Sequence, residues 1–426
     1  MKLDRQWIVG LIIFMATNQS VFAAPVTLSL DESIDMALKN NYDIKYAKSA
    51  REKSYWVVEE TKKNKKVSVD FAHTDQRYNS LSSVSSEYTY TNNFDNRVTL
   101  SLPIYSGGKL ESQIDKAKLD LKVADLDIYV AKQQLKGDVV TNYFTVLEYR
   151  NEVEVDQKAV DNYLDHLNLV NSKYELGIVA KTDVLSSQVD LAKAQDTLIK
   201  AQNNYNNAVA TLNNAIGLSH GTELQLKDNF KYEKYSLTLE QCIAYAEVHR
   251  PEIAQYAAKA ASAHYDEKIA KSEYLPKVDL TAEEDWNDSR IPGLKNNNWM
   301  LKLTTSLNLF DSGLTSSKVK QAQHNVDMVG DKAAKQRDSI LLDVRQYYLS
   351  MYEAEKRIDT NQVSVNQAEE NLAIQKVRYD VGVGTNLDLL DAVLSLNSAQ
   401  KNYIQALYDY NSNKAKLEQA MGSPVK

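Results

Sequence analysis

A heptad pattern of apolar side chains predicts very long helices. Between residues 109 and 176, apolar positions recur at alternating steps of four and three residues, which is the seam of a coiled coil. The stripe begins with Leu110, Ile114, Ala117, Leu121, Ala124, Ile128, Ala131 and Leu135. No proline interrupts this stretch, so we expect one helix about 100 Å long at about 1.5 Å per residue.

Four shorter segments alternate apolar and polar positions with a period of two, which predicts β-strands. They cover about residues 66–74, 96–105, 277–285 and 299–310. In the first segment Val67, Val69 and Phe71 share one face, and polar residues occupy the other. One apolar and one strongly polar face is typical of a transmembrane barrel strand. A soluble hairpin on a helical core is the alternative, but nothing else in the predicted elements would cover the apolar face.

Four strands cannot close a barrel, and open strand edges cannot face lipid. The strands therefore predict that several copies of the chain share one barrel. The polar segments 75–96 and 285–298 between the paired strands are expected to be loops outside the cell, with aromatic residues near the membrane interface.

The chain contains an internal duplication. Residues 174–185 return as 379–390, at an offset of 205 positions, and residues 28–34 return as 237–243 at an offset of 209. We therefore predict a first repeat over 24–217, a linker over 218–236 and a second repeat over 237–426. The helices expected from the pattern are about 31–62, 109–176, 182–216, 239–272, 314–381 and 387–421.

The first residues have the pattern of an export signal. Lys2 and Arg5 precede an apolar run over 7–16, and small residues lead up to Ala23. The run is about half the length that a membrane-spanning helix needs. We expect residues 1–23 to be a signal peptide that is cleaved after Ala23.

Composition narrows the possible functions. A net charge of −7 argues against nucleic-acid binding, and the single Cys242 excludes an intrachain disulfide framework. The six histidines are scattered without metal-ligand spacing, and no nucleotide-binding loop is present, so neither an enzyme nor a cofactor is expected. Glycine and proline are scarce, at 13 and 6 residues, which favours long helices.

Together these motifs resemble the TolC family of outer-membrane efflux channels. The resemblance rests on segment 28–41, the strand exit 102–108, residues 273–276 before a strand, and the two Tyr-x-x-Gly turns of the duplication. It implies a mainly helical homotrimer with a twelve-stranded barrel in outer-membrane lipid. It also implies a twelve-helix periplasmic tunnel that docks onto a periplasmic adaptor (a membrane fusion protein) and an inner-membrane pump, either ABC or proton-driven.

Two acids at one predicted helix tip are candidates for a selective entrance. Asp388 and Asp391 are three residues apart near the start of a helix, so both face one side. They match the acidic pair of the family's constriction, and in a three-fold assembly they would form two stacked carboxylate rings that favour cations. The alternative is that an acid in the first helical turn is favoured by the helix dipole. That alternative applies equally to Asp183, which lies at the equivalent position of the first repeat.

The resemblance also implies a closing contact at the same tip. In family members an arginine, an acid and a tyrosine hold the entrance closed; Tyr379 and Asp183 match two of them, and Gly384 occupies the arginine position. We expect the segment 379–391 to be the moving gate, with Gly382 and Gly384 permitting its tight turn. Arg378 or Lys181 is the candidate substitute for the missing arginine.

Two functions of different class fit the sequence. One is a passive exit duct for drug efflux or type I protein secretion. The other is a structural coiled-coil protein of the envelope, a tether or adhesin. A tether needs no amphipathic strands, so the duplicated strand pairs favour the duct.

Overall fold

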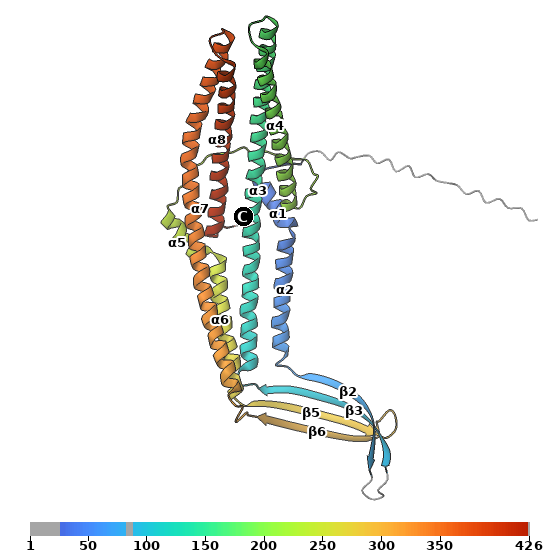
Figure 1. The fold of residues 1–426 in the computed structure, drawn as a ribbon. Helices are drawn as coiled ribbons and strands as arrows, with labels where there is room; N and C mark the ends of the chain where they lie inside the picture. The colour runs from blue at the N-terminus through green and yellow to red at the C-terminus, as the bar shows by residue number, and fades with distance from the viewer. Residues whose placement is uncertain (1–25, 82–87, 425–426) are drawn as a thin grey trace, which may run out of the picture.

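The computed structural model describes residues 26–81 and 88–424. The expected signal segment 1–23 lies outside the described residues, as do residues 24–25, 82–87 and 425–426. Each repeat contains two shorter helices, a strand pair, a very long helix and a final helix (Figure 1).

The helices and strands of the first repeat are β1 (Val26–Leu28), α1 (Leu30–Asn40), α2 (Tyr42–Lys63), β2 (Ser68–Leu81), β3 (Tyr88–Tyr105), α3 (Lys109–Glu175) and α4 (Lys181–Ile216). Those that follow are β4 (Leu224–Leu226), α5 (Leu239–His249), α6 (Pro251–Lys271), the 3₁₀ turn η1 (Ser272–Tyr274), β5 (Lys277–Asp288), β6 (Asn296–Ser306), α7 (Leu314–Asp380) and α8 (Asn386–Met421). The long helices α3 and α7 each have 67 residues.

Two expected helices are each split into two, and those expectations were wrong. The helix expected over 31–62 breaks at Asn41, whose side-chain Oδ1 accepts a hydrogen bond from the Asp43 N–H at 2.7 Å and caps α2. The helix expected over 239–272 breaks at Arg250 because Pro251 follows it. A residue before proline is kept out of the helical conformation, and the proline then starts α6.

The strands also differ from the expected bounds. Most of the loop expected over 75–96 is paired instead, with β2 and β3 in register as far as Leu81 opposite Tyr88. Tyrosine and threonine favour strands, so this polar stretch can extend the ladder. At the other end, β6 stops at Ser306 rather than at 310, because its partner β5 begins at Lys277 opposite Ser306.

The four long strands form one antiparallel sheet in the order β2-β3-β5-β6, so β2 and β6 are its edges. Cross-strand partners share a face. Phe71 pairs with Val98 and Leu280 with Leu303 on the apolar face, and the Phe71 and Leu303 side chains are mostly exposed. On the opposite face Asp70 pairs with Thr99. The sheet therefore has an apolar face that the single chain leaves uncovered.

The helices form a long column from which the sheet extends sideways at one end (Figure 1). The α3 helix runs the length of the column, in contact with α2 and α4 on one side and with α6 and α8 on the other. The α7 helix contacts α6 and α8. Within the described part of the chain, no helix is both long enough and apolar enough to cross a membrane.

Two helical hairpins make up much of the column: the first is α3 with α4 and the second is α7 with α8. The linker expected over 218–236 crosses from the first hairpin to the second. Its β4 strand pairs in parallel with β1. Asp228 accepts hydrogen bonds from the Tyr143 hydroxyl at 2.8 Å and from the Leu30 N–H at 3.0 Å. Further along, the Tyr232 hydroxyl donates to Glu355 of α7 at 2.7 Å. The linker therefore ties the first hairpin to the second.

Candidate functional site at the helix tips

The two helical hairpins end in equivalent tight turns at the end of the column away from the sheet (Figure 1). Gly177 and Gly382 lie in the left-handed region, with φ of 75° and 80°, where a side chain is disfavoured. The Ile178 N–H donates to the Lys173 carbonyl at 2.9 Å, and the Val383 N–H donates to the Arg378 carbonyl at 3.0 Å. The duplication therefore extends to the hydrogen bonds of the turns.

Asp388 caps the start of α8. Its Oδ2 accepts from the Thr385 N–H at 3.1 Å, and the Thr385 hydroxyl accepts from the Asp388 N–H at 3.1 Å. The bonds with Thr385 lower the pKa of Asp388, so it is ionised at neutral pH. Asp183 makes the first of these bonds, from the Ala180 N–H at 3.3 Å, but Ala180 has no side-chain oxygen for the second. Helix capping therefore accounts for part of the role of both acids.

Asp391 lies one turn further along α8, and its side chain is exposed. Among the hydrogen bonds and ion pairs of residues 26–81 and 88–424, none involves the Asp391 side chain. The Asp391 charge also acts on Tyr163 of α3. Burial is the main cause that raises the pKa of Tyr163, and the negative charges of Asp190 and Asp391 raise it further. In the part of the chain that the structure describes, Asp388 and Asp391 thus present two carboxylates near the tip of α8 with no lysine or arginine paired to them.

Tyr379 anchors the end of α7 against the first hairpin. Its side chain is 4% exposed, and its ring lies edge-on to His166 with the centroids 4.9 Å apart. The Lys173 ammonium is 4.1 Å from the ring centroid and also donates to the Tyr379 carbonyl. Burial is the main cause that raises the pKa of Tyr379 and lowers that of His166.

His166 also connects the hairpins through a second contact. Its Nε2 is paired with Oδ1 of Asn386, the first residue of α8, and the Ser187 hydroxyl donates to the same oxygen at 3.4 Å. His166, Lys173 and Asn386 were not singled out from the sequence. The available signal was the spacing of seven residues between His166 and Lys173, which puts both on one face of α3.

The structure does not join Tyr379 and Asp183 by a hydrogen bond. The Tyr379 hydroxyl has no hydrogen-bond partner among the described residues, and the Asp183 carboxylate is used at the start of α4. At Gly384 an added Cβ would lie 3.1 Å from both the Arg378 Cβ and the Tyr379 N, so this turn has no room for an arginine without moving. The contact that holds Tyr379 is therefore made by Lys173 and His166.

A metal site does not emerge from the described part of the chain: no group of three or more His, Cys, Asp or Glu side chains converges there.

Comparison with known proteins finds similar sequences and structures. A family model described as "Outer membrane efflux protein" matches residues 33–218 and 243–423. The Escherichia coli outer membrane protein TolC is 24% identical over 364 residues, which cover 80% of this chain and 74% of TolC. The alkaline protease secretion protein AprF of Pseudomonas aeruginosa is 26% identical over 294 residues, covering 67% of this chain and 60% of AprF.

Solved structures share the fold at lower identity. The Campylobacter jejuni CmeC outer membrane channel superposes with a TM-score of 0.84 at 19% identity, over 92% of this chain and 85% of CmeC. The outer membrane protein VceC of Vibrio cholerae superposes with a TM-score of 0.79 at 17% identity, over 92% of this chain and 96% of VceC.

Proposed function

Because the chain belongs to the outer membrane efflux protein family, it is a subunit of a passive exit duct rather than an enzyme, and we propose that the helix tips form its gate. The duct lies in the outer membrane and has a large periplasmic portion. The two-faced sheet fits lipid on its apolar side and a polar lumen on the other. A coiled-coil tether or adhesin does not account for such a sheet.

We propose a homotrimer whose four strands per chain close a twelve-stranded barrel, with the helices continuing as a periplasmic tunnel. The open edges β2 and β6 support this assembly, since unpaired edges are not tolerated in lipid. A periplasmic adaptor and an inner-membrane pump would dock at the helix tips and open them. Relatives are named for protease secretion and for solvent efflux, so both protein and small-molecule cargo are open to this chain.

One observation carries the gate proposal: Asp388 and Asp391 are exposed near the tip of α8, one turn apart, and neither forms an ion pair among the described residues. Three copies would bring six carboxylates to one narrow entrance. Closely spaced carboxylate rings favour cations and retain multivalent ones. The proposed gate is therefore cation-selective and blocked by divalent cations from the periplasmic side.

The test is single-channel recording of the purified protein in planar bilayers. Asp388→Asn with Asp391→Asn removes the charges, while the amide oxygen introduced at position 388 can still accept the capping hydrogen bond from the Thr385 N–H. We expect weaker cation selectivity and loss of divalent-cation block. Asp31→Asn is the matched control, since Asp31 also lies in the first turn of a helix but far from the tip. Unchanged block in the double variant would refute the carboxylate-ring proposal.

A further inference from the structure

The duplication makes the two sides of the chain unequal. The bounds of α3 and α7 differ by 205 positions, and so do those of α4 and α8. In space, α3 is covered by α2 and α4 on one side and by α6 and α8 on the other, whereas α7 packs against α5, α6 and α8 of its own repeat. The equivalent of the α3–α8 seam is therefore a seam between α7 and an α4 helix that the single chain does not supply.

Equivalent side chains on α8 and α4 show what is missing. Leu390 and Ile404 of α8 are 6% and 8% exposed. Asn397, seven residues from each, donates to an α3 carboxylate at 3.2 Å, so this stripe faces α3. Their counterparts on α4, Leu185 and Ile199, are 51% and 65% exposed. The stripe is therefore buried on α8, where it packs against α3, and the equivalent stripe on α4 is exposed.

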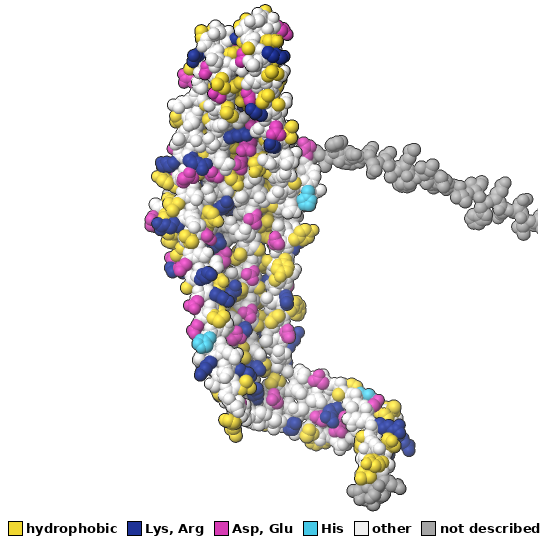
Figure 2. Space-filling model, in the orientation of Figure 1, with side chains coloured by type: hydrophobic (Ala, Val, Ile, Leu, Met, Phe, Trp, Pro, Cys, Tyr) yellow, Lys and Arg dark blue, Asp and Glu magenta, His cyan; other side chains and the backbone are white. Residues whose placement is uncertain are grey.

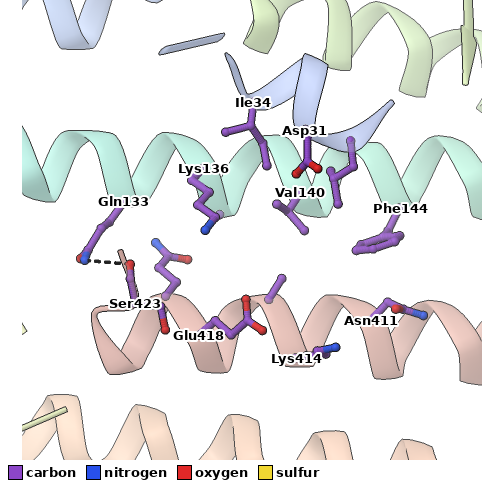
Figure 3. Close-up of a pocket in the computed structure, with 14 residues that line it drawn as sticks. Asp31, Ile34, Gln133, Lys136, Val140, Phe144, Asn411, Lys414, Glu418 and Ser423 are labelled. Carbon is purple, nitrogen blue, oxygen red and sulfur yellow. Dashed lines mark hydrogen bonds between the residues drawn. The ribbon is translucent and has the colours of Figure 1, made fainter. Parts of the chain in front are cut away.

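The free side of α7 carries the complementary apolar positions. On α3, Gly137 and Phe144 line a cleft of about 250 Å³ against α8 (Figure 3). Their counterparts on α7, Leu342 and Leu349, are more than half exposed. Apolar side chains also appear on the surface along the length of the column (Figure 2). A second copy, bringing α4 to α7, would cover both bare faces with one contact that repeats around a ring.

The polar contact between α3 and α7 at the tip has a counterpart too. Lys173 at the end of α3 contacts the ring and the carbonyl of Tyr379. The positions 205 residues away are Arg378 on α7 and Tyr174 on α3. Both are exposed in the single chain, and an aromatic ring and a cationic side chain are retained at these positions. The Lys181 ammonium of the same chain lies 5.3 Å from the centroid of the Tyr174 ring, which remains 41% exposed. An arginine guanidinium can stack on an aromatic face, and its N–H groups can donate to a carbonyl.

We propose that Arg378 of each subunit crosses the subunit boundary and contacts the ring and main-chain carbonyl of the partner subunit's Tyr174. This inference rests on the proposed ring of copies and adds a tip contact between subunits. Lys173 contacts Tyr379 where the two hairpins of one chain meet, and Arg378 would contact Tyr174 where neighbouring chains meet. Every boundary between hairpins at the periplasmic tip would then contain a cationic side chain on a tyrosine ring.

The first test is cross-linking with a short bis-maleimide in a Cys242→Ala background. Arg378→Cys with Tyr174→Cys should give covalent dimers and trimers after heat denaturation. Lys173→Cys with Tyr379→Cys is the matched control, because this pair lies within one chain and should leave the heated protein as single chains. Cross-links between positions 378 and 174 only within one chain, or only to an adaptor, would overturn the proposed contact.

The second test measures the thermal stability of the oligomer. Samples are heated to a series of temperatures before gel electrophoresis, and the temperature at which the oligomer band gives way to single chains is recorded. Arg378→Ala should lower this temperature, and Arg378→Lys should retain most of it, since Lys173 makes the equivalent contact. No difference between Arg378→Ala and the unsubstituted protein would overturn the proposal. If the unsubstituted protein were a single chain in every detergent, the proposed trimeric duct itself would fail, which is a separate result.

Discussion

At the scale of single residues, Tyr379 is held by its ring and its backbone rather than by its hydroxyl. The hydroxyl has no hydrogen-bond partner among the described residues, while Lys173 and His166 contact the ring. We therefore predict that Tyr379→Phe leaves the closed state unchanged in bilayer recordings. Tyr379→Ala should increase the open time severalfold, because it removes the buried ring. An opening effect of Tyr379→Phe as large as that of Tyr379→Ala would show that the hydroxyl closes the gate.

Glu148 is a buried acid on α3. Burial is the main cause that raises its pKa to about 8, and the nearby negative charges of Glu152 and Asp409 add to it. Between its ordinary pKa of 4.5 and about 8, the folded chain holds a proton that the unfolded chain releases. The free energy of unfolding therefore falls as the pH rises through this window.

Replacing Glu148 by glutamine should remove that pH dependence. We predict that Glu148→Gln stabilises the protein at pH 9 by about 1–3 kcal/mol and flattens the decrease of Tm between pH 5 and pH 9. Glu353→Gln is the matched control, because Glu353 is the equivalent residue on α7 but is exposed and lies 3.5 Å from Arg357. If Tm fell equally with pH in the unsubstituted protein and in Glu148→Gln, the pKa of Glu148 would not be raised in the folded protein.

At the scale of helices, the two tips differ in one capping residue. Thr385 completes the reciprocal cap of α8 with Asp388, whereas Ala180 leaves the cap of α4 half made. We predict that Thr385→Ala costs about 1 kcal/mol and that Ala180→Ser gains a similar amount. Amide hydrogen exchange in the first turn of α8 should become faster in the first variant, and that of α4 slower in the second. Unchanged exchange in both turns would exclude the caps as determinants of tip stability.

Periodicity predicted the helices because each long helix buries one stripe, but it could not show every interruption. Pro251 was an available signal for the break at Arg250, and the break at Asn41 depends on a cap that competes with continued helix. The duplication located Tyr379 and Asp388 at a turn. It could not identify His166 or Lys173, because their roles depend on which helices become neighbours, and a heptad stripe does not specify its partner.

At the scale of the whole molecule, the unpaired edges of the sheet continue into the sides of the helical column that have no neighbouring helix among the described residues. The edge strand β2 follows α2 directly, and the edge strand β6 leads into α7. The α2–α4 side and the α7 side are also the two sides of the column that lack neighbours among the described residues. A contact between copies at these boundaries would therefore complete the barrel and the tunnel together.

This arrangement makes the two faces of the sheet unequal in their tolerance of charge. Leu303 pairs with Leu280 on the apolar face, and Thr304 pairs with Asp279 on the polar face. Leu303→Arg would place a charge against hydrocarbon at a cost of about 2–4 kcal/mol near the bilayer centre. We predict that it greatly reduces the unheated trimer in outer-membrane extracts, whereas Thr304→Arg, one residue away, retains it. Equal yields of trimer from both variants would mean that lipid does not cover the apolar face, because only a lipid-facing position distinguishes these neighbouring substitutions.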